Sequence, residues 1–153
     1  MIELAETPEQ IQTVRELFLE YANSLNFSLC FQGFDKELAE LPGEYAPPEG
    51  RLLLALSDGA VAGCGALHKL GPQICEMKRL YLRRSYRGKG LGRVLCERIL
   101  SEARQIGYRH LRLDTVEPSM MDAVAMYRRM GFREIAAYRS NPVAGAKYME
   151  IDL

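Results

Sequence analysis

The stretch SYRGKGLGR, residues 85–93, constrains the fold of this chain more than any other feature. It follows the apolar run QICEMKRLYLR and precedes a run in which apolar residues recur every three or four positions, so it joins a predicted strand to a predicted helix. The first backbone N–H groups of a helix lack partners within the helix and carry the positive end of its dipole. A strand, a glycine-rich turn and a helix in this order therefore predict an anion-binding site. The stretch also supplies three glycines that leave room for a phosphate and three basic residues that attract one: Gly88, Gly90, Gly92, Arg87, Lys89 and Arg93.

Two common phosphate-binding motifs do not fit this stretch. A P-loop needs Ser or Thr directly after its Gly-Lys pair, whereas the GKG of this chain is followed by Leu91. A dinucleotide fingerprint has the spacing G-x-G-x-x-G inside a βαβ unit, whereas these glycines are evenly spaced and follow a meander of strands. Both usual nucleotide interpretations are therefore weakened.

The N-terminal third carries helix signals. Thr7 and Gln10 form a capping-box pattern, so a helix begins there, and its apolar stripe continues as far as Leu25. Asp35 is predicted to cap a second, shorter helix within residues 34–41. The proline- and glycine-rich segment that follows cannot continue a helix and is predicted to be a loop.

From residue 51 onward, strand and helix signals alternate. A third helix is predicted to end at Gly107, and a fourth to begin at a Ser119 cap and end at Gly131. The predicted strands cover residues 2–4, 51–57, 60–70, 73–83, 109–115, 132–138 and 146–153. Short glycine-containing turns join the three strands after residue 51 into an antiparallel meander. The whole order predicts a mixed α/β sheet in one domain.

Composition and charge exclude several classes of protein. The 153 residues contain 20 Lys plus Arg and 20 Asp plus Glu, so no net charge attracts nucleic acid or an anionic membrane. No stretch approaches eighteen apolar residues and the N-terminus has no apolar leader, so neither export nor a membrane span is expected. The cysteines lack C-x-x-C spacing and stand in apolar contexts, which predicts reduced packing thiols of a cytoplasmic protein: Cys30, Cys64, Cys75 and Cys96.

Two motifs in order resemble the GCN5-related N-acetyltransferase (GNAT) family. The first runs from Arg87 to Gly92, has the pattern R-x-x-G-x-G and opens the third helix; the second, AMYRRMGF at 125–132, places a tyrosine four residues before a Gly-Phe pair. The resemblance covers residues 51–138 well and the N-terminal third only in its order of elements. It implies an α/β (α+β) fold with a mixed, mostly antiparallel central sheet of about seven strands flanked by four helices. Residues 1–153 would then form a single acetyltransferase domain.

The resemblance also implies a reaction and a cosubstrate. Acetyl-coenzyme A would give its acetyl group directly to a primary amine in a ternary complex. The turn amides would bind the coenzyme pyrophosphate, and an exposed strand edge would pair with the pantetheine arm, with one N–H facing the thioester oxygen. The implied coenzyme-binding residues are Leu80, Tyr81, Leu82, Arg87, Gly88, Lys89, Gly90, Leu91, Gly92 and Arg93.

Two residues are candidates for acid–base catalysis. By resemblance, Tyr127 would protonate the departing thiolate, although its spacing on the helix also suits a core aromatic. Glu76 matches the position of a catalytic glutamate in some family members, and burial would raise its pKa and suit it to accept a proton. Lys78 would share its face in a regular strand, so an ion pair is the alternative, unless a β-bulge, which the family often carries here, upsets that parity.

Met120, the two histidines and the basic run bear on how the site binds its ligands. Many family members hold a pantetheine amide with an asparagine seven residues before the tyrosine, where this chain has Met120. His68 and His110 have no partner at ligand spacing, so both are predicted to be structural and no metal is expected. The basic run over residues 78–89 could suggest RNA binding, but the neutral net charge and the few interleaved aromatics disfavour it. The expected partners are thus acetyl-coenzyme A and an amine, with no nucleic acid and no membrane; a homodimer is left open.

The acceptor amine is the least constrained part of the prediction. Residues 21–34 and 138–148, where the family binds its acceptor, hold several aromatics and few acids, which favours a small acceptor carrying a carboxylate or an aromatic group. Arg139, beside a turn defined by Pro142 and Gly145, is the predicted partner for such a carboxylate, with a solvated arginine as the alternative. Two other functions stay open: a coenzyme A-binding protein without turnover, and an acetyltransferase of protein N-termini or lysines.

Overall fold

The computed structural model describes residues 1–25, 28–29, 33–116 and 121–153. Its elements follow the predicted order: β1 (Ile2–Leu4), α1 (Pro8–Ser24), α2 (Phe34–Glu40), β2 (Arg51–Ser57), β3 (Ala60–Gly71), β4 (Ile74–Leu82), α3 (Leu91–Ile106), β5 (His110–Val116), α4 (Met121–Met130), β6 (Arg133–Ile135) and β7 (Ala146–Asp152). Short 3-10 turns occupy Gly43–Tyr45, within the predicted loop, and Arg84–Tyr86. Within these described ranges, no helix has the length and apolar character needed to cross a bilayer.

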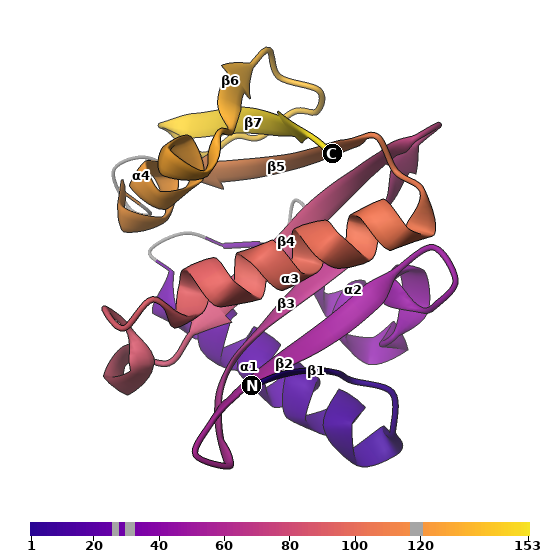
Figure 1. Cartoon of the computed structure of the whole chain (residues 1–153), viewed down its shortest axis with the longest axis vertical. Coiled ribbons are helices and arrows are strands. Elements are labelled where there is room, and N and C mark those ends of the chain that lie inside the picture. The colour runs from indigo at the N-terminus through magenta and orange to yellow at the C-terminus, as the bar shows by residue number, and fades with distance from the viewer. Residues whose placement is uncertain (26–27, 30–32, 117–120) are drawn as a thin grey trace.

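The strands form one seven-stranded sheet in the order β1-β2-β3-β4-β5-β7-β6. Every neighbouring pair is antiparallel except β4 and β5, which run parallel. Figure 1 shows α3 lying across one face of the sheet, with β5, β6, β7 and α4 gathered at one end. The predicted α/β (α+β) fold, with its mostly antiparallel seven-stranded sheet and four helices, is confirmed.

Strand β2 shows how the sheet separates two apolar cores. Leu52 and Leu54 pack with α1 and α2, whereas Leu53 and Ala55 pack with α3 and α4. This division follows from the period of two in a strand, because successive side chains point to opposite faces. Both faces are buried, which explains why RLLLALS is a nearly continuous apolar run.

The helix ends test the predicted caps. The Thr7 hydroxyl accepts from the Gln10 N–H at 3.1 Å, and the Gln10 side chain accepts from the Thr7 N–H at 3.0 Å, so the capping box is confirmed. Gly107 also adopts its predicted left-handed conformation. Asp35 as a cap was wrong: the N-cap of α2 is Gly33, in a left-handed conformation, so α2 begins at Phe34 and Asp35 lies in its first turn. The predicted Ser119 cap lies outside the described residues.

A β-bulge interrupts β4. Cys64 pairs with Tyr81 and Ala66 with Lys78, so two residues of β4 stand opposite one of β3, and Arg79 takes a φ of 59°. The bulge follows Lys78, so the strand is regular between Glu76 and Lys78. Their side chains therefore lie on the same face of the sheet, the one covered by α1 and α2.

The described cysteines are packing residues, as predicted. Cys64, Cys75 and Cys96 are free thiols with no exposed surface. Burial raises the pKa of both Cys75 and Cys96 to about 12, so neither carries a reactive thiolate near neutral pH. Cys30 lies outside the described residues.

Candidate active site

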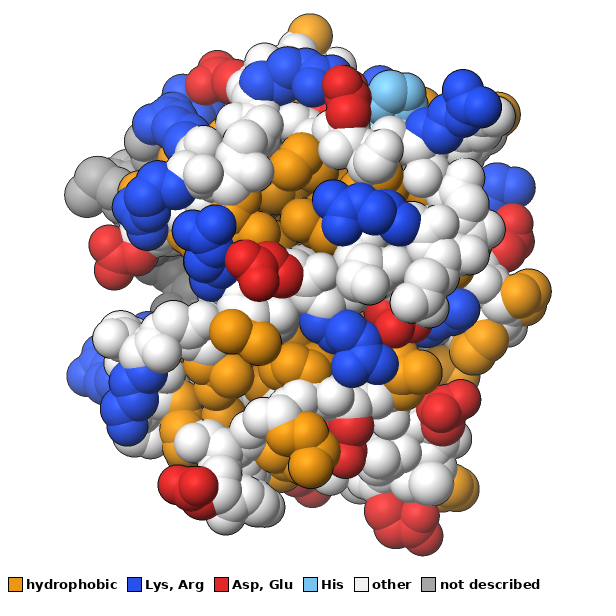
Figure 2. All heavy atoms as spheres, in the orientation of Figure 1, with side chains coloured by type: hydrophobic (Ala, Val, Ile, Leu, Met, Phe, Trp, Pro, Cys, Tyr) orange, Lys and Arg blue, Asp and Glu red, His pale blue; other side chains and the backbone are white. Residues whose placement is uncertain are grey.

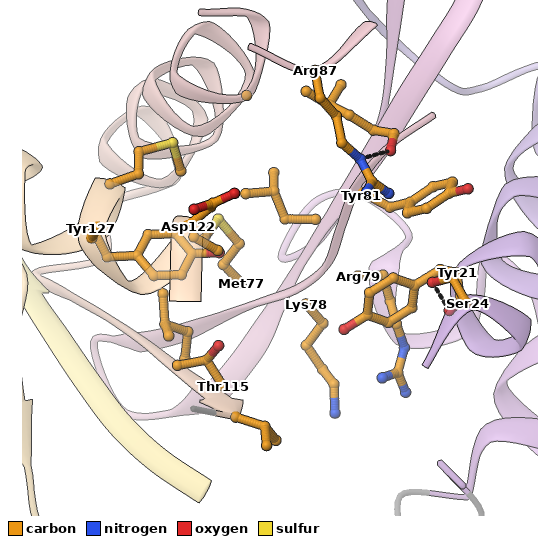
Figure 3. Close-up of a pocket in the computed structure, with 18 of the residues that line it drawn as sticks. Tyr21, Ser24, Met77, Lys78, Arg79, Tyr81, Arg87, Thr115, Asp122 and Tyr127 are labelled. Carbon is orange, nitrogen blue, oxygen red and sulfur yellow. Dashed lines mark hydrogen bonds between the residues drawn. The ribbon is translucent and has the colours of Figure 1, made fainter. Parts of the chain in front are cut away.

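The parallel strands β4 and β5 separate part way along their length. They pair only from Ile74 opposite His110 to Glu76 opposite Arg112, and then continue to Leu82 and Val116 without pairing. Between them opens a cleft of about 1020 Å³, which is walled by β4, β5, α1, α4 and the first turn of α3. Figure 3 shows side chains from these elements converging on it. Because β4 beyond Glu76 pairs with β3 alone among the described strands, its other backbone edge faces the cleft.

The glycine-rich turn forms one end of the cleft. Gly88 and Gly90 have φ values of 77° and 81°, which glycine adopts at little cost, and a Cβ on either would meet open space. Gly90 is the N-cap of α3, and no side chain caps this helix. The first N–H groups of α3 therefore remain available to an anion.

Basic side chains surround that end. Arg84, Arg87 and Arg93 line the cleft, and Figure 2 shows Lys and Arg side chains on both sides of the hollow near α4 and the start of α3. Arg87 is held in place, since its Nε donates to the Leu82 carbonyl oxygen at 2.8 Å and its guanidinium lies 5.8 Å from the centre of the Tyr81 ring. The local positive charge that the sequence predicted at this turn is thus present in a chain with zero net charge.

Most of the residues predicted to bind the coenzyme lie on the cleft wall. These are Leu80, Tyr81, Leu82, Arg87, Gly88, Gly90, Gly92 and Arg93. Lys89 is exposed and Leu91 packs against the α3 core, and neither lines the cleft. For Leu91 the backbone N–H remains the relevant group, because it lies in the uncapped first turn of α3.

Gly92 has a different role from the two glycines before it. It lies within α3 without a positive φ, and a Cβ there would approach Leu82 at 3.4 Å and Met126 at 3.9 Å. Glycine at this position keeps the space between α3, β4 and α4 open. A larger side chain would project into the cleft.

Tyr127 reaches the cleft from α4, as the second motif predicted. Its ring packs against Phe132 with centroids 5.3 Å apart, and Figure 3 shows it pointing inward toward Met77. The side chain is only 6% exposed, and burial raises the pKa of its hydroxyl well above the usual value. Within the described ranges this hydroxyl donates to no protein acceptor. It is therefore both a core aromatic and an available proton donor.

Glu76 is fully buried and already has three partners. His68 Nε2 lies 2.8 Å away, the Tyr138 hydroxyl donates at 2.6 Å, and an Arg139 nitrogen lies 2.7 Å away. Burial raises the pKa of Glu76, but the His68 hydrogen bond and the nearby positive charges outweigh it and lower the pKa to about 2. The expectation of a raised pKa is wrong. Glu76 does not line the cleft, and its ion-pair partner is Arg139 and not Lys78.

The Arg139 guanidinium is therefore already occupied by an ion pair with Glu76. Besides its contact with Glu76, its guanidinium lies 5.1 Å from the centre of the Tyr138 ring. The turn after it is defined, because the Asn141 side-chain oxygen accepts from the Val143 N–H at 2.9 Å and Gly145 has a φ of 84°. The turn itself fits the prediction, but Arg139 faces a buried carboxylate and not solvent.

Two of the six basic residues in the run over residues 78–89 are neutralised by ion pairs. Arg79 pairs with Glu37 through two hydrogen bonds of 2.9 and 3.0 Å, and Arg83 pairs with Glu20 at 2.6 Å. Arg79 also lies over the Phe34 ring at 5.2 Å. These arginines hold helices α1 and α2 to β4.

The cleft also contains residues that the sequence reasoning missed or misplaced. Asp114 of β5 lines it, and so does Lys78, and neither had been assigned to the coenzyme or acceptor site. Tyr21 of α1 and Asn141 also line it, and they lie in the segments predicted to bind the acceptor, residues 21–34 and 138–148. The apolar stripe of α1 assigned Tyr21 to the core, and the alternation of RHLRLDT gave no reason to single out Asp114. Only the separation of β4 from β5 brings these residues together.

The two histidines have partners that sequence spacing could not reveal. His68 contacts Glu76, and His110 Nδ1 lies 2.9 Å from Asp152, with Glu150 nearby. His110, Glu150 and Asp152 could in principle hold a cation, but Arg112 and Arg133 already pair with these carboxylates. The group lies outside the cleft and is explained as an ion-pair network.

Comparisons with known proteins agree with this geometry. The family model described as "Acetyltransferase (GNAT) family" matches residues 11–132. A Schizosaccharomyces pombe protein named as an uncharacterized N-acetyltransferase is 35% identical over 154 residues, which cover 99% of this chain and 94% of that protein.

Solved structures share the fold. The crystal structure of a GNAT-family acetyltransferase from Staphylococcus aureus has a TM-score of 0.80 at 17% identity and covers 99% of both chains. The PaiA N-acetyltransferase of Thermoplasma acidophilum, in complex with coenzyme A, has a TM-score of 0.73 at 19% identity and covers 100% of this chain and 99% of its own. With the family model and the fission yeast relative, these findings show that the chain belongs to the GNAT family of acetyltransferases.

Proposed function

We propose that this chain transfers the acetyl group of acetyl-coenzyme A directly to a primary amine of a small molecule, in a ternary complex. The observation that carries the proposal is the continuity of one cleft, from the uncapped N-terminus of α3 to the open edge of β4 and on to Tyr127. A long anionic cosubstrate with an amide-containing arm fits that series of groups. The PaiA structure, with the same fold, contains coenzyme A.

Each part of the cleft would do one task in this reaction. The α3 amides with Arg87 and Arg93 would bind the phosphates, and the free edge of β4 would hydrogen-bond the pantetheine arm. Acetyl-coenzyme A would supply the acetyl group as an activated thioester. The amine nitrogen bonds to the carbonyl carbon, the carbon–sulfur bond breaks, and the sulfur takes a proton that Tyr127 is placed to give.

The amine must also lose a proton. Glu76 was predicted to accept it, but a carboxylate with a pKa of about 2 is a weak base. We therefore assign Glu76 the task of holding Arg139, Tyr138 and His68 in place. Asp114 is a carboxylate that lines the cleft, and its only hydrogen bond within the described ranges is accepted from Asn141 at 3.3 Å, so it is the better-placed acceptor.

Gly92→Leu tests coenzyme binding. The helical φ of Gly92 suits leucine, but the new side chain would project between Leu82 and Met126, so we expect acetyl-coenzyme A to bind at least about tenfold more weakly, measured by calorimetry. Gly71→Leu is the matched control, because a Cβ at Gly71 meets open space and the residue lies outside the cleft. Wild-type affinity in Gly92→Leu, or no binding to the parent protein at millimolar ligand, would contradict the assignment of this cleft.

A further inference from the structure

Oppositely charged side chains line the cleft where β4 and β5 separate: Lys78 on β4 and Asp114 on β5. The other charged residues of the cleft wall that form no ion pair with a described residue come from the turn before α3 and from α4: Arg84, Arg87, Asp122 and Arg129. Lys78 points into the cleft from β4 and Asp114 from β5, and neither forms a salt bridge with any residue that the structure describes. Figure 3 shows the Lys78 side chain and the Tyr21 ring directed toward the same open space. Glu76 and Lys78 share a sheet face, yet Glu76 takes Arg139 as its partner.

The other charged groups around Lys78 are already satisfied. Arg79 is neutralised by Glu37 and Arg139 by Glu76, at 2.9 and 2.7 Å. Among the described residues, the Asp114 carboxylate accepts a hydrogen bond from Asn141 alone, at 3.3 Å. Of the described β4 and β5 residues that line the cleft, one ammonium and one carboxylate thus remain open to a ligand, those of Lys78 and Asp114.

Burial of the Lys78 ammonium has an energetic cost. Burial, together with the nearby charge of Arg79, lowers the pKa of its ammonium. A desolvated charge without a counter-ion is costly, and a bound anion would relieve that cost. Glu76 and Asp114 are near enough to oppose this shift, but neither forms an ion pair with Lys78 among the residues that the structure describes.

We propose that the acceptor is an amino-acid-like zwitterion, whose carboxylate binds Lys78 and whose amine lies at Asp114. This inference rests on the proposed acetyl transfer and names the class of its acceptor. The sequence predicted that Arg139 binds the acceptor carboxylate; the proposal assigns that contact to Lys78 instead. It also disfavours a protein N-terminus as acceptor, because the carboxyl group next to that amine is consumed in a peptide bond.

The test compares amines that differ only in the carboxylate. Glycine, phenylalanine and glutamine are assayed against glycinamide, phenylalaninamide and glutaminamide, with kcat/KM measured at a fixed acetyl-coenzyme A concentration. We expect at least one acid to exceed its amide by about tenfold or more through a lower KM. Lys78→Met should abolish that preference and Lys78→Arg should restore part of it, with the KM for acetyl-coenzyme A unchanged in both.

The matched control is Lys69→Met, which removes the same charge from the adjacent strand β3, where Lys69 pairs with the exposed Glu49 outside the cleft. It should keep the preference of the parent. Amides that react as well as the acids, or a preference that survives in Lys78→Met, would overturn the inference.

Failure of the proposed function gives a different result. If acetyl-coenzyme A binds but no amine is acetylated, the proposed acetyl transfer is wrong. The class of ligand that binds at Lys78 is then tested separately, by calorimetric titration of the same acids and amides in the presence of coenzyme A. Binding of an acid that requires Lys78 supports the inference, and binding of neither member of any pair overturns it.

Discussion

Replacing Tyr127 by phenylalanine is expected to lower kcat by about 10²–10⁴-fold and to leave the KM for acetyl-coenzyme A nearly unchanged. The hydroxyl lies at the cleft without a protein acceptor among the described residues, and its raised pKa keeps it protonated at neutral pH, so that it can donate a hydrogen bond and a proton to the sulfur as negative charge develops there. Its contribution should therefore come only when the carbon–sulfur bond breaks. Steady-state kinetics with acetyl-coenzyme A varied at saturating amine measure both constants.

Tyr108→Phe is the matched control for this variant. Tyr108 is also a buried tyrosine of the α3 core, but its hydroxyl donates to the Glu49 carbonyl oxygen at 2.7 Å, away from the cleft. Its loss should lower the free energy of unfolding by about 1 kcal/mol and leave kcat unchanged. If Tyr127→Phe loses coenzyme affinity and kcat equally, Tyr127 serves packing and not proton transfer.

Glu76→Gln is expected to lower the free energy of unfolding by about 3 kcal/mol at pH 7. The fold lowers the pKa of this carboxyl from 4.5 to about 2, so the unfolded chain binds its proton more readily than the folded one. That stabilisation is fully present above pH 4.5 and is lost as the pH falls toward 2. The difference between the parent and Glu76→Gln, measured by denaturant unfolding, should shrink over the same range.

Glu134→Gln is the control for the pH dependence. Glu134 pairs with Lys147 at 3.3 Å on the surface, where its side chain is 53% exposed, so the change should cost less than about 1 kcal/mol. A destabilisation by Glu76→Gln that stays constant down to pH 2 would show that the ionised carboxylate is not what stabilises the fold.

The same variant separates the two roles considered for Glu76. A group with a pKa of about 2 does not titrate near neutral pH, so any acidic limb of the pH–rate profile should persist in Glu76→Gln. Disappearance of that limb would identify Glu76 as the base after all.

Local signals predicted most of the architecture and one end of the cleft. The capping box at Thr7 and the left-handed Gly107 depend on neighbours within a few residues, and so do the turn glycines before α3. Such features can be found in one sequence because their cause lies in the same short segment. The prediction of Asp35 as the cap of α2 was wrong because Gly33 adopts a positive φ and serves as the N-cap instead.

The interior of the cleft could not be predicted in this way. Glu76 meets Tyr138 and Arg139 across more than sixty positions of sequence, and these contacts reverse the direction of its pKa shift. Lys78 becomes available only because Arg139 and not Lys78 pairs with Glu76. Contacts between β4 and the segment before β7 depend on sheet order, which no local pattern of residues 74–82 contains.

The most direct measurement is the release of coenzyme A thiol from acetyl-coenzyme A by the parent protein, with and without amines, together with mass spectrometry of the amine and of the intact protein. We expect thiol release to depend on the amine, one acetylated amine to form per thiol, and the protein to carry no acetyl group when the amine is omitted. Tight binding of acetyl-coenzyme A with no amine-dependent release would make the chain a coenzyme-binding protein, and an acetylated protein competent to pass its acetyl group to the amine would contradict direct transfer.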